Sequence, residues 1–458
     1  MKTFTFVCFT ISMLWLNSVV WAEHSVETVL EEPEVEKHYE KKLVIVSSFP
    51  AIIGSTFKQA FEKKHPKVEV IVTKKKTTAG IKLIESKKNN NNIDLFWVSA
   101  PDAFEVLKEK GLLQKYTPKT KGIPKKVNGY PVNDPEGYYV GFSSSGYGIM
   151  WNTEYLKKHN LPEPKQWVDL TRSEYRRHIG LSAPSRSGTT HLTIEGILQL
   201  KGWKQGWSII KEIGANAKVI TQKSSHVPKG VINGDFGIGI VIDLYALSAI
   251  AADHPIGFSY PTDTVFVPAN IGIIKNAPEK ELAADFIEFV LSEEGQKLLL
   301  EPGISRLPIR PEIYSGRIPN YYPLPYGDKQ YGSVTPFDVK LSKGRYNVVN
   351  SLFDVMITYQ HEDLQLAMRA IQNAEISFSA TRFAKPKIAK AINLSRDLIN
   401  KLPVDEATSS TPNFASKFTQ RRKKESDVIE GEQAEIEKKW QTMAQDNYDA
   451  VYDAVSIF

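Results

Sequence analysis

The sequence predicts an α/β protein of two lobes joined by a hinge and followed by an α-helical C-terminal extension. Short apolar runs alternate with amphipathic stretches over 43–111 and again over 180–252, which is typical of parallel sheets covered by helices on both faces. Two extended apolar segments, 138–151 and 265–274, connect these alternating units. Beyond about residue 319 the strand pattern gives way to helical periodicity.

The first alternating unit begins at residue 43. Its apolar runs are short enough for buried strands, and its helices stop at His65-Pro66 and at Gly111. The second unit repeats the pattern and returns through 265–274 to a long helical stretch. Strands are predicted at 43–46, 68–72, 94–98, 180–183 and 236–242, and helices at 53–64, 81–84, 102–111, 189–200, 207–213, 244–252 and 279–300. We therefore expect lobe one to comprise 43–140 and 266–318, and lobe two to comprise 141–265.

The extension, 319–458, carries amphipathic helices with one apolar face each. The polar segment 404–413 is typical of a flexible link. We expect the helices before this link to pack on the lobes. The last helix, which presents Trp440 and Met443 on one face, is the better candidate for contact with a partner, and packing on the lobes is the alternative.

The first residues have the composition of a secretory signal. Lys2 precedes an apolar segment, 4–16, that is short for a membrane span, and Val20 and Ala22 suit a cleavage site before Glu23. We expect 1–22 to be a cleaved signal peptide and 23–42 a charged linker, although an N-terminal anchor is the alternative. No later stretch has the ~18 apolar residues of a spanning helix. The mature protein is expected to be periplasmic and not membrane-inserted.

Composition excludes several classes of function. The only cysteine, Cys8, lies in the signal segment, so the mature chain is expected to lack disulfides and thiolate sites. The net charge of +6 is small for 458 residues, and no aromatic and basic platform suggests nucleic-acid binding. The sequence has no G-x-S-x-G elbow and no H-E-x-x-H motif. We expect no enzyme activity, no cofactor and no metal site.

The segment 184–191, P-S-R-S-G-T-T-H, lies between a predicted strand and a predicted helix. A helix N-terminus attracts anions, and glycine allows close backbone approach. Arginine binds two oxygens of a phosphate or carboxylate, and hydroxyl groups donate further hydrogen bonds. The alternative is that Ser187 or Thr189 only caps the helix. The predicted anion-binding residues are Ser185, Arg186, Ser187, Gly188, Thr189, Thr190 and His191.

Other polar residues follow predicted strands, where a cleft between the lobes would lie. Ser47, Ser99 and Ser144 are candidate hydroxyl donors, each with a cap or turn as the alternative. Asp243 is a candidate acceptor for a polyol ligand or, equally, a helix cap. For His191, the alternative to ligand binding is a histidine whose hydrogen bonds are made within the protein.

The stretch 182–207, SAPSRSGTTHLTIEGILQLKGWKQGW, resembles the lobe-two motif of ABC-transporter periplasmic substrate-binding proteins of the iron(III) and phosphoryl-compound group. It is most similar to binding proteins of phosphoglycerate transport regulation. The wider resemblance covers about 43–311 and implies a type II periplasmic-binding-protein fold, in which two lobes close about a hinge.

The resemblance implies a receptor for a small anionic, phosphoglycerate-like metabolite that feeds an ABC permease or a sensor kinase. The alternative is a ferric-ion carrier. Ferric binders resemble one another in two adjacent tyrosines after the strand equivalent to 236–242, where this chain has Asp243 and a single tyrosine, Tyr245. The pair Tyr321-Tyr322 lies in a different region. This departure from the ferric binders favours an anionic ligand over a ferric ion.

Overall fold

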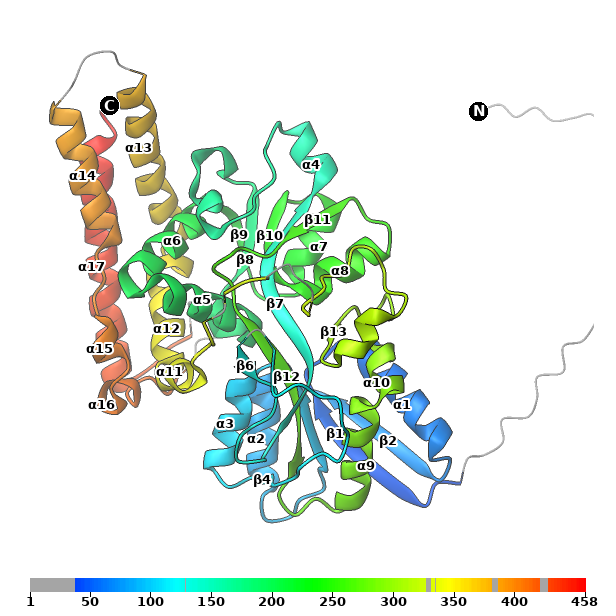
Figure 1. Cartoon of the computed structure of the whole chain (residues 1–458). Helices are drawn as coiled ribbons and strands as arrows, with labels where there is room; N and C mark the ends of the chain where they lie inside the picture. The colour runs from blue at the N-terminus through cyan, green and yellow to red at the C-terminus, as the bar shows by residue number, and fades with distance from the viewer. Residues whose placement is uncertain (1–37, 128, 327–330, 334, 381–385, 421–426) are drawn as a thin grey trace, which may run out of the picture. The chain divides into compact units, whose positions relative to one another are not determined.

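One long strand, β7 (Val140–Asn152), is shared by two halves of a continuous sheet, and all of its residues are buried (Figure 1). Its first half pairs antiparallel with β12 (Phe266–Ile274), and its second half pairs with β10 (Ile238–Ile242) and β11 (Ile256–Ser259). The strand order is β2 (Val68–Lys74), β1 (Lys41–Ser47), β3 (Leu95–Val98), β12, β7, β10, β8 (Ile179–Ser182) and β9 (Ala217–Thr221). This arrangement confirms the predicted α/β class, with the two extended segments side by side.

This computed structural model describes residues 38–458 except 128, 327–330, 334, 381–385 and 421–426. The expected signal peptide, 1–22, and most of the expected linker, 23–42, lie outside the described residues. Within the described residues, no helix has both the length and the apolar character that a membrane span requires.

The first sheet contains the strands on the β2 side of β7, and helices cover both of its faces. Leu43 and Ile45 belong to the core on one face, whereas Val46 belongs to the core on the other. This alternation is expected for a strand buried on both sides. The remaining strands and helices around it are β1 (Lys41–Ser47), α1 (Ala51–Lys64), β2 (Val68–Lys74), α2 (Thr77–Lys87), β3 (Leu95–Val98), α3 (Pro101–Glu109), β4 (Leu113–Gln114), β5 (Lys126–Val127), β6 (Tyr130–Pro131), α9 (Lys280–Leu291), α10 (Glu293–Leu298) and β13 (Leu307–Pro308).

The second sheet contains the second half of β7 with the strands beyond it. Its helices α5 (Gly188–Lys201) and α6 (Trp203–Asn216) are separated only by Gly202, whose φ of 77° allows the sharp turn between them. The other elements of this part are α4 (Thr153–Lys158), β8 (Ile179–Ser182), α5 (Gly188–Lys201), α6 (Trp203–Asn216), β9 (Ala217–Thr221), α7 (His226–Asn233) and α8 (Asp243–Ala251).

The single helix expected over 279–300 is two helices. Ser292 ends α9 and caps α10, because its side chain accepts a hydrogen bond from the amide of Gly295 at 3.1 Å. A serine that caps a new helix interrupts an otherwise continuous helical pattern.

From Val339 onward, the described part of the C-terminal extension contains helices that pack against the second sheet and its helices. Its three longest helices lie side by side (Figure 1). Buried residues of the extension, such as Leu364 and Tyr448, belong to the same hydrophobic cluster as Leu198 and Trp207 of α5 and α6. The helices are α11 (Val339–Gly344), α12 (Tyr346–Phe353), α13 (His361–Ser379), α14 (Pro386–Asn400), α15 (Glu406–Ser409), α16 (Pro412–Ala415) and α17 (Gly431–Val455).

Two expectations for the extension are wrong. The last helix, α17, is not left for a partner, because Trp440 and Val451 are buried in the cluster shared with α13 and α14. The segment 404–413 is not an irregular link, because Asp405 and Thr411 cap two short helices there. The long helices α13, α14 and α17 therefore belong to the core of this part of the protein.

Candidate functional site

The predicted anion-binding segment forms a turn between β8 and α5. Pro184–Arg186 makes one turn of 3-10 helix, and Ser187 is the N-cap of α5. The Oγ of Ser187 accepts a hydrogen bond from the amide of Thr190 at 3.2 Å. Ser187 therefore caps the helix, which was the alternative to anion binding for this residue. The first amides of a helix have no intrahelical acceptor, and those of Gly188 and Thr189 are in this position. The site therefore combines free amides with the positive end of a helix.

Ser185 and Arg186 bring buried donors to the same turn. Ser185 is 4% exposed, and its Oγ has no hydrogen-bond partner among the described residues. The Nε and Nη1 of Arg186 are likewise buried and unpaired in the described part of the chain. Buried polar atoms are almost always hydrogen-bonded in folded proteins. Three unpaired donors at a helix N-terminus are therefore suited to an anionic ligand.

Gly188 places this turn against the first sheet. A Cβ atom added at Gly188 would lie 3.9 Å from the Cβ of Ala100, which is an ordinary contact. Ala100 is the N-cap of α3, and it follows Ser99 at the end of β3. Residues after a strand of each sheet therefore meet here, at the kind of position where α/β sheets bind ligands.

Arg306, between α10 and β13, donates hydrogen bonds to three serine hydroxyl groups on the first-sheet side. Its Nη1 donates to the Oγ of Ser143 at 3.3 Å and to that of Ser145 at 3.2 Å. Its Nη2 donates to the Oγ of Ser99 at 2.8 Å, and the guanidinium lies 4.3 Å from the ring centre of Phe49. Sequence reasoning missed Arg306, and its only signal was an arginine within the apolar stretch 304–309.

Among the predicted hydroxyl donors, only Ser99 contacts Arg306. Ser144 lies between Ser143 and Ser145 on β7, and alternate residues of a strand face opposite sides of its sheet. Ser47 ends β1, and its Oγ accepts from the amide of Phe49 at 3.2 Å. Ser47 is therefore a turn residue, and Ser144 is not brought to the Arg306 group.

Asp243 lies in the first turn of α8 with its carboxylate fully buried. It accepts hydrogen bonds from the amide of Gly146 at 2.7 Å, from the amide of Leu244 at 2.8 Å and from the hydroxyl of Tyr260 at 3.0 Å. Burial raises the pKa of Asp243 to about 6, although these bonds and the charge of Arg306 oppose the shift. Its oxygens already have internal donors, so we do not assign it to a polyol.

The positive charge of Arg306 persists despite burial. Burial lowers the pKa of Arg306 to about 10, and the carboxylate of Asp243 is the strongest opposing influence. The guanidinium is therefore protonated at neutral pH. Tyr147 of β7 lies in the same electrostatic environment, and burial raises the pKa of its hydroxyl well above the ordinary value. Tyr147 is therefore a neutral donor.

His191 faces the C-terminal extension. Its Nδ1 lies 2.9 Å from the Oδ1 of Asn350, its Nε2 lies 3.2 Å from the Oγ of Ser342, and its ring packs against Tyr346. Burial lowers the pKa of His191 to about 3. The histidine is therefore neutral and occupied internally, and the structure does not bring it together with Ser185 and Arg186.

A pH prediction follows for His191. Between pH 6.5 and about 3 the unfolded chain binds a proton that the folded protein excludes, so stability falls as the pH falls through this window. The slope is about 1.4 kcal/mol per pH unit. From pH 7 to pH 5, the stability advantage of the wild type over His191→Asn should shrink by about 2 kcal/mol in urea unfolding. Parallel pH curves would contradict this account, and exposed His226→Asn is the control.

An internal ion pair holds the same helix, α5, to the extension. The Nη2 of Arg345 lies 2.7 Å from the carboxylate of Glu195, and both side chains are fully buried. Glu406 adds a second carboxylate at 2.8 Å from Nη1 of Arg345. Burial lowers the pKa of Arg345, but the two carboxylates raise it by more, so the net shift is upward. This ion pair therefore ties the helix that follows the predicted anion-binding turn to the extension.

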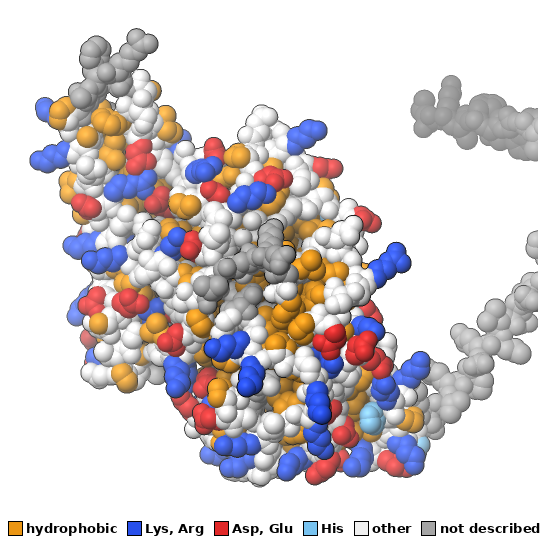
Figure 2. All heavy atoms as spheres, viewed as in Figure 1, with side chains coloured by type: hydrophobic (Ala, Val, Ile, Leu, Met, Phe, Trp, Pro, Cys, Tyr) orange, Lys and Arg blue, Asp and Glu red, His pale blue; other side chains and the backbone are white. Residues whose placement is uncertain are grey.

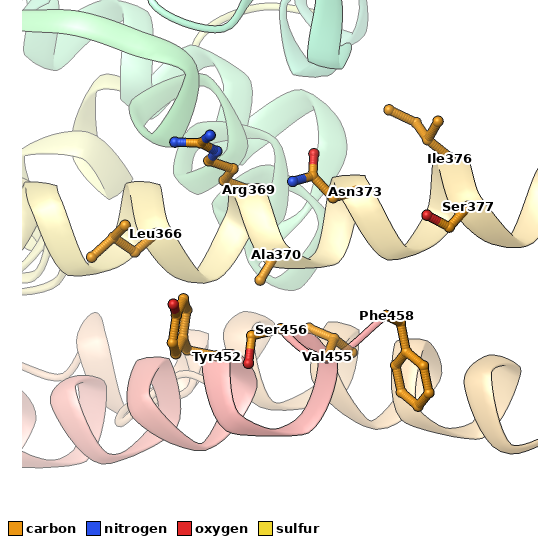
Figure 3. A pocket seen from close by; sticks show the side chains of 10 residues that line it. All are labelled: Leu366, Arg369, Ala370, Asn373, Ile376, Ser377, Tyr452, Val455, Ser456 and Phe458. Atoms are coloured by element: carbon orange, nitrogen blue, oxygen red, sulfur yellow. The ribbon is translucent and has the colours of Figure 1, made fainter.

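A groove of about 660 Å³ lies elsewhere, between α13 and α17 (Figure 3). Leu366 and Ile376 line it from α13, and Tyr452 and Phe458 line it from the C-terminal end of the chain. Among the described residues that line it, Arg369 has the one charged side chain. Its lining contains none of the predicted anion-binding residues, so we do not treat it as the ligand site.

The two sheets that share β7 have the fold of the two-lobed periplasmic binding proteins of type II. The family described as bacterial extracellular solute-binding protein matches residues 56–322, which is more than half of the chain. The protein belongs to this family.

Individual proteins are similar to this chain in sequence or in fold. The phosphoglycerate transport regulatory protein PgtC of Salmonella typhimurium is 26% identical over 396 residues, 86% of this chain and 93% of the relative. The match is longer than the part of the chain before residue 319, so it includes part of the extension. The periplasmic binding protein AfuA of Actinobacillus pleuropneumoniae, with exogenous fructose-6-phosphate bound, has 22% identity and a TM-score of 0.60, covering 69% of this chain and 98% of that one. Iron-bound HitA of Pseudomonas aeruginosa has 18% identity and a TM-score of 0.52, covering 62% and 90%. The structural likenesses show the fold.

Proposed function

We propose that this protein is a periplasmic receptor for a small anionic metabolite, with a phosphorylated carboxylic acid of the phosphoglycerate type as the preferred ligand. One observation carries the proposal: the Nε and Nη1 of Arg186 and the Oγ of Ser185 are buried, unpaired within the described chain, and placed at the N-terminus of α5. A phosphoryl group needs several donors and positive charge together.

The relatives support a phosphorylated ligand. PgtC is named for phosphoglycerate transport, and the AfuA structure holds a sugar phosphate. A ferric ion is less well supported by the residues present, although HitA binds iron. The oxygens of Asp243 already accept internal hydrogen bonds, and the hydroxyl of Tyr322 is directed to the carbonyl of Leu299 at 3.5 Å.

In this proposal the signal peptide 1–22 directs export, and the mature protein performs no chemistry. Lobe one, 43–140 with 266–318, and lobe two, 141–265, close about β7 and β12 when ligand binds. The closed protein delivers its ligand to an ABC permease or reports it to a membrane sensor kinase. Charges of both signs are mixed over the face seen in Figure 2, which suits a soluble receptor better than a nucleic-acid-binding protein.

A thermal-shift screen of the mature protein tests the proposal, because a ligand that binds only the folded state raises the melting temperature. The panel is 3-phosphoglycerate, glycerol 3-phosphate, fructose 6-phosphate, inorganic phosphate, glycerol and ferric citrate. We expect the phosphorylated compounds to raise the melting temperature and glycerol to leave it unchanged. A shift with ferric citrate alone would replace the proposal with iron binding.

A further inference from the structure

Arg306 is a buried cation whose hydrogen-bond partners are neutral. It is 1% exposed, and the three hydrogen bonds of its guanidinium go to serine hydroxyls. A buried charge is costly unless an opposite charge or a full set of hydrogen bonds compensates it. Asp243 acts on Arg306 through space, but its oxygens bond to Gly146, Leu244 and Tyr260. Arg306 therefore retains the capacity to bind an anion directly.

Two donors beside this charge are unpaired. The Nε of Arg306 and the hydroxyl of Tyr147 are both buried, and neither has a hydrogen-bond partner among residues that the structure describes. Tyr147 follows Ser143 and Ser145 at alternate positions of β7, so its side chain lies on the same face of the strand as the two serines that accept hydrogen bonds from Arg306. Together they offer a positive charge and two directed hydrogen bonds, which is what an acidic group requires.

The Arg306 group lies across from the anion-binding turn. Its partner Ser99 is adjacent in sequence to Ala100, and Ala100 contacts the position of Gly188 at the start of α5. Arg306 contacts the first-sheet side of this junction, whereas Arg186 precedes a helix of the second sheet. Each lobe therefore contributes one arginine with unpaired donors.

We propose that Arg306, assisted by Tyr147, is a second anion-binding group, and that the site selects ligands with two acidic groups over ligands with one. This inference rests on the proposed function and specifies its ligand. One acidic group binds the turn formed by Ser185, Arg186 and Gly188. The other binds Arg306, so a ligand with two acidic groups connects the lobes and favours their closure.

Calorimetric titration with 3-phosphoglycerate and glycerol 3-phosphate tests the inference, because the second compound lacks the carboxylate. The wild type should bind 3-phosphoglycerate at least roughly tenfold more tightly. Arg306→Gln should remove most of this preference and change the affinity for glycerol 3-phosphate little. An equal loss for both ligands, or no loss for either, would overturn the inference. Failure of the wild type to bind either ligand would instead overturn the proposed function, and the inference with it.

Tyr147→Phe provides a second variant, in case Arg306→Gln fails to fold. It removes an unpaired hydroxyl and keeps the ring, so folding should be unaffected. Affinity for 3-phosphoglycerate should fall roughly fivefold, and affinity for glycerol 3-phosphate should not change. Ser395→Ala is the matched control, since its Oγ is also buried and unpaired within the described residues but lies on α14. Equal effects of Tyr147→Phe and Ser395→Ala would contradict the assignment.

Discussion

Arg186→Ala should weaken binding of an anionic ligand by about 2 to 4 kcal/mol, or roughly 30- to 1,000-fold. The substitution removes a charged donor pair from the N-terminus of α5, where the amides of Gly188 and Thr189 cannot replace it. Its Nε and Nη1 have no partner in the described chain, so the melting temperature without ligand should change little. Calorimetric titration with 3-phosphoglycerate measures the loss.

The control for this variant is Arg172→Ala, which removes a largely exposed arginine and changes net charge equally. Arg172→Ala should leave the affinity for 3-phosphoglycerate within about twofold of the wild-type value, because surface ion pairs contribute little. Unchanged affinity in Arg186→Ala, or equal losses in both variants, would show that Arg186 does not bind the ligand.

Glu195→Ala should destabilise the folded protein by about 3 to 5 kcal/mol, because it leaves the buried charge of Arg345 without its main partner. The remaining carboxylate, Glu406, is half-exposed and cannot compensate fully. Urea unfolding measures the loss. A secondary loss of ligand affinity is expected, since Glu195 lies on the helix that carries the anion-binding turn.

Two further variants separate charge burial from packing. Glu406→Ala should cost less than about 1 kcal/mol, because its side chain is half-exposed to solvent. The double variant Glu195→Leu with Arg345→Met should recover much of the stability, because an apolar pair avoids the desolvation of two charges. A cost below 1 kcal/mol for Glu195→Ala would show that the pair does not stabilise this contact.

The sheet elements could be predicted from sequence because their signals are local. The runs at 43–46 and 236–242 are apolar without interruption, as strands buried on both faces require. The turn that we propose as the anion site stands out in the sequence, because its serines, arginine and glycine are contiguous at a strand-to-helix junction.

The missed features depend on contacts distant in sequence. Arg306 bonds to Ser99, Ser143 and Ser145, and nothing in the residues around position 306 indicates those partners. Every residue of β7 is buried, so no alternation of buried and exposed positions indicates which serine of 143–145 faces the site. The apolar face of α17 would look the same whether it packs on its own chain or on another protein.

A crystal structure of the mature protein with 3-phosphoglycerate tests the central claim most directly. We predict that one acidic group of the ligand accepts hydrogen bonds from the Nε and Nη1 of Arg186, the Oγ of Ser185 and the amide of Gly188. The other should meet the Nε of Arg306. A ligand that binds in solution but lies elsewhere, with Arg186 and Ser185 out of contact, would contradict the account.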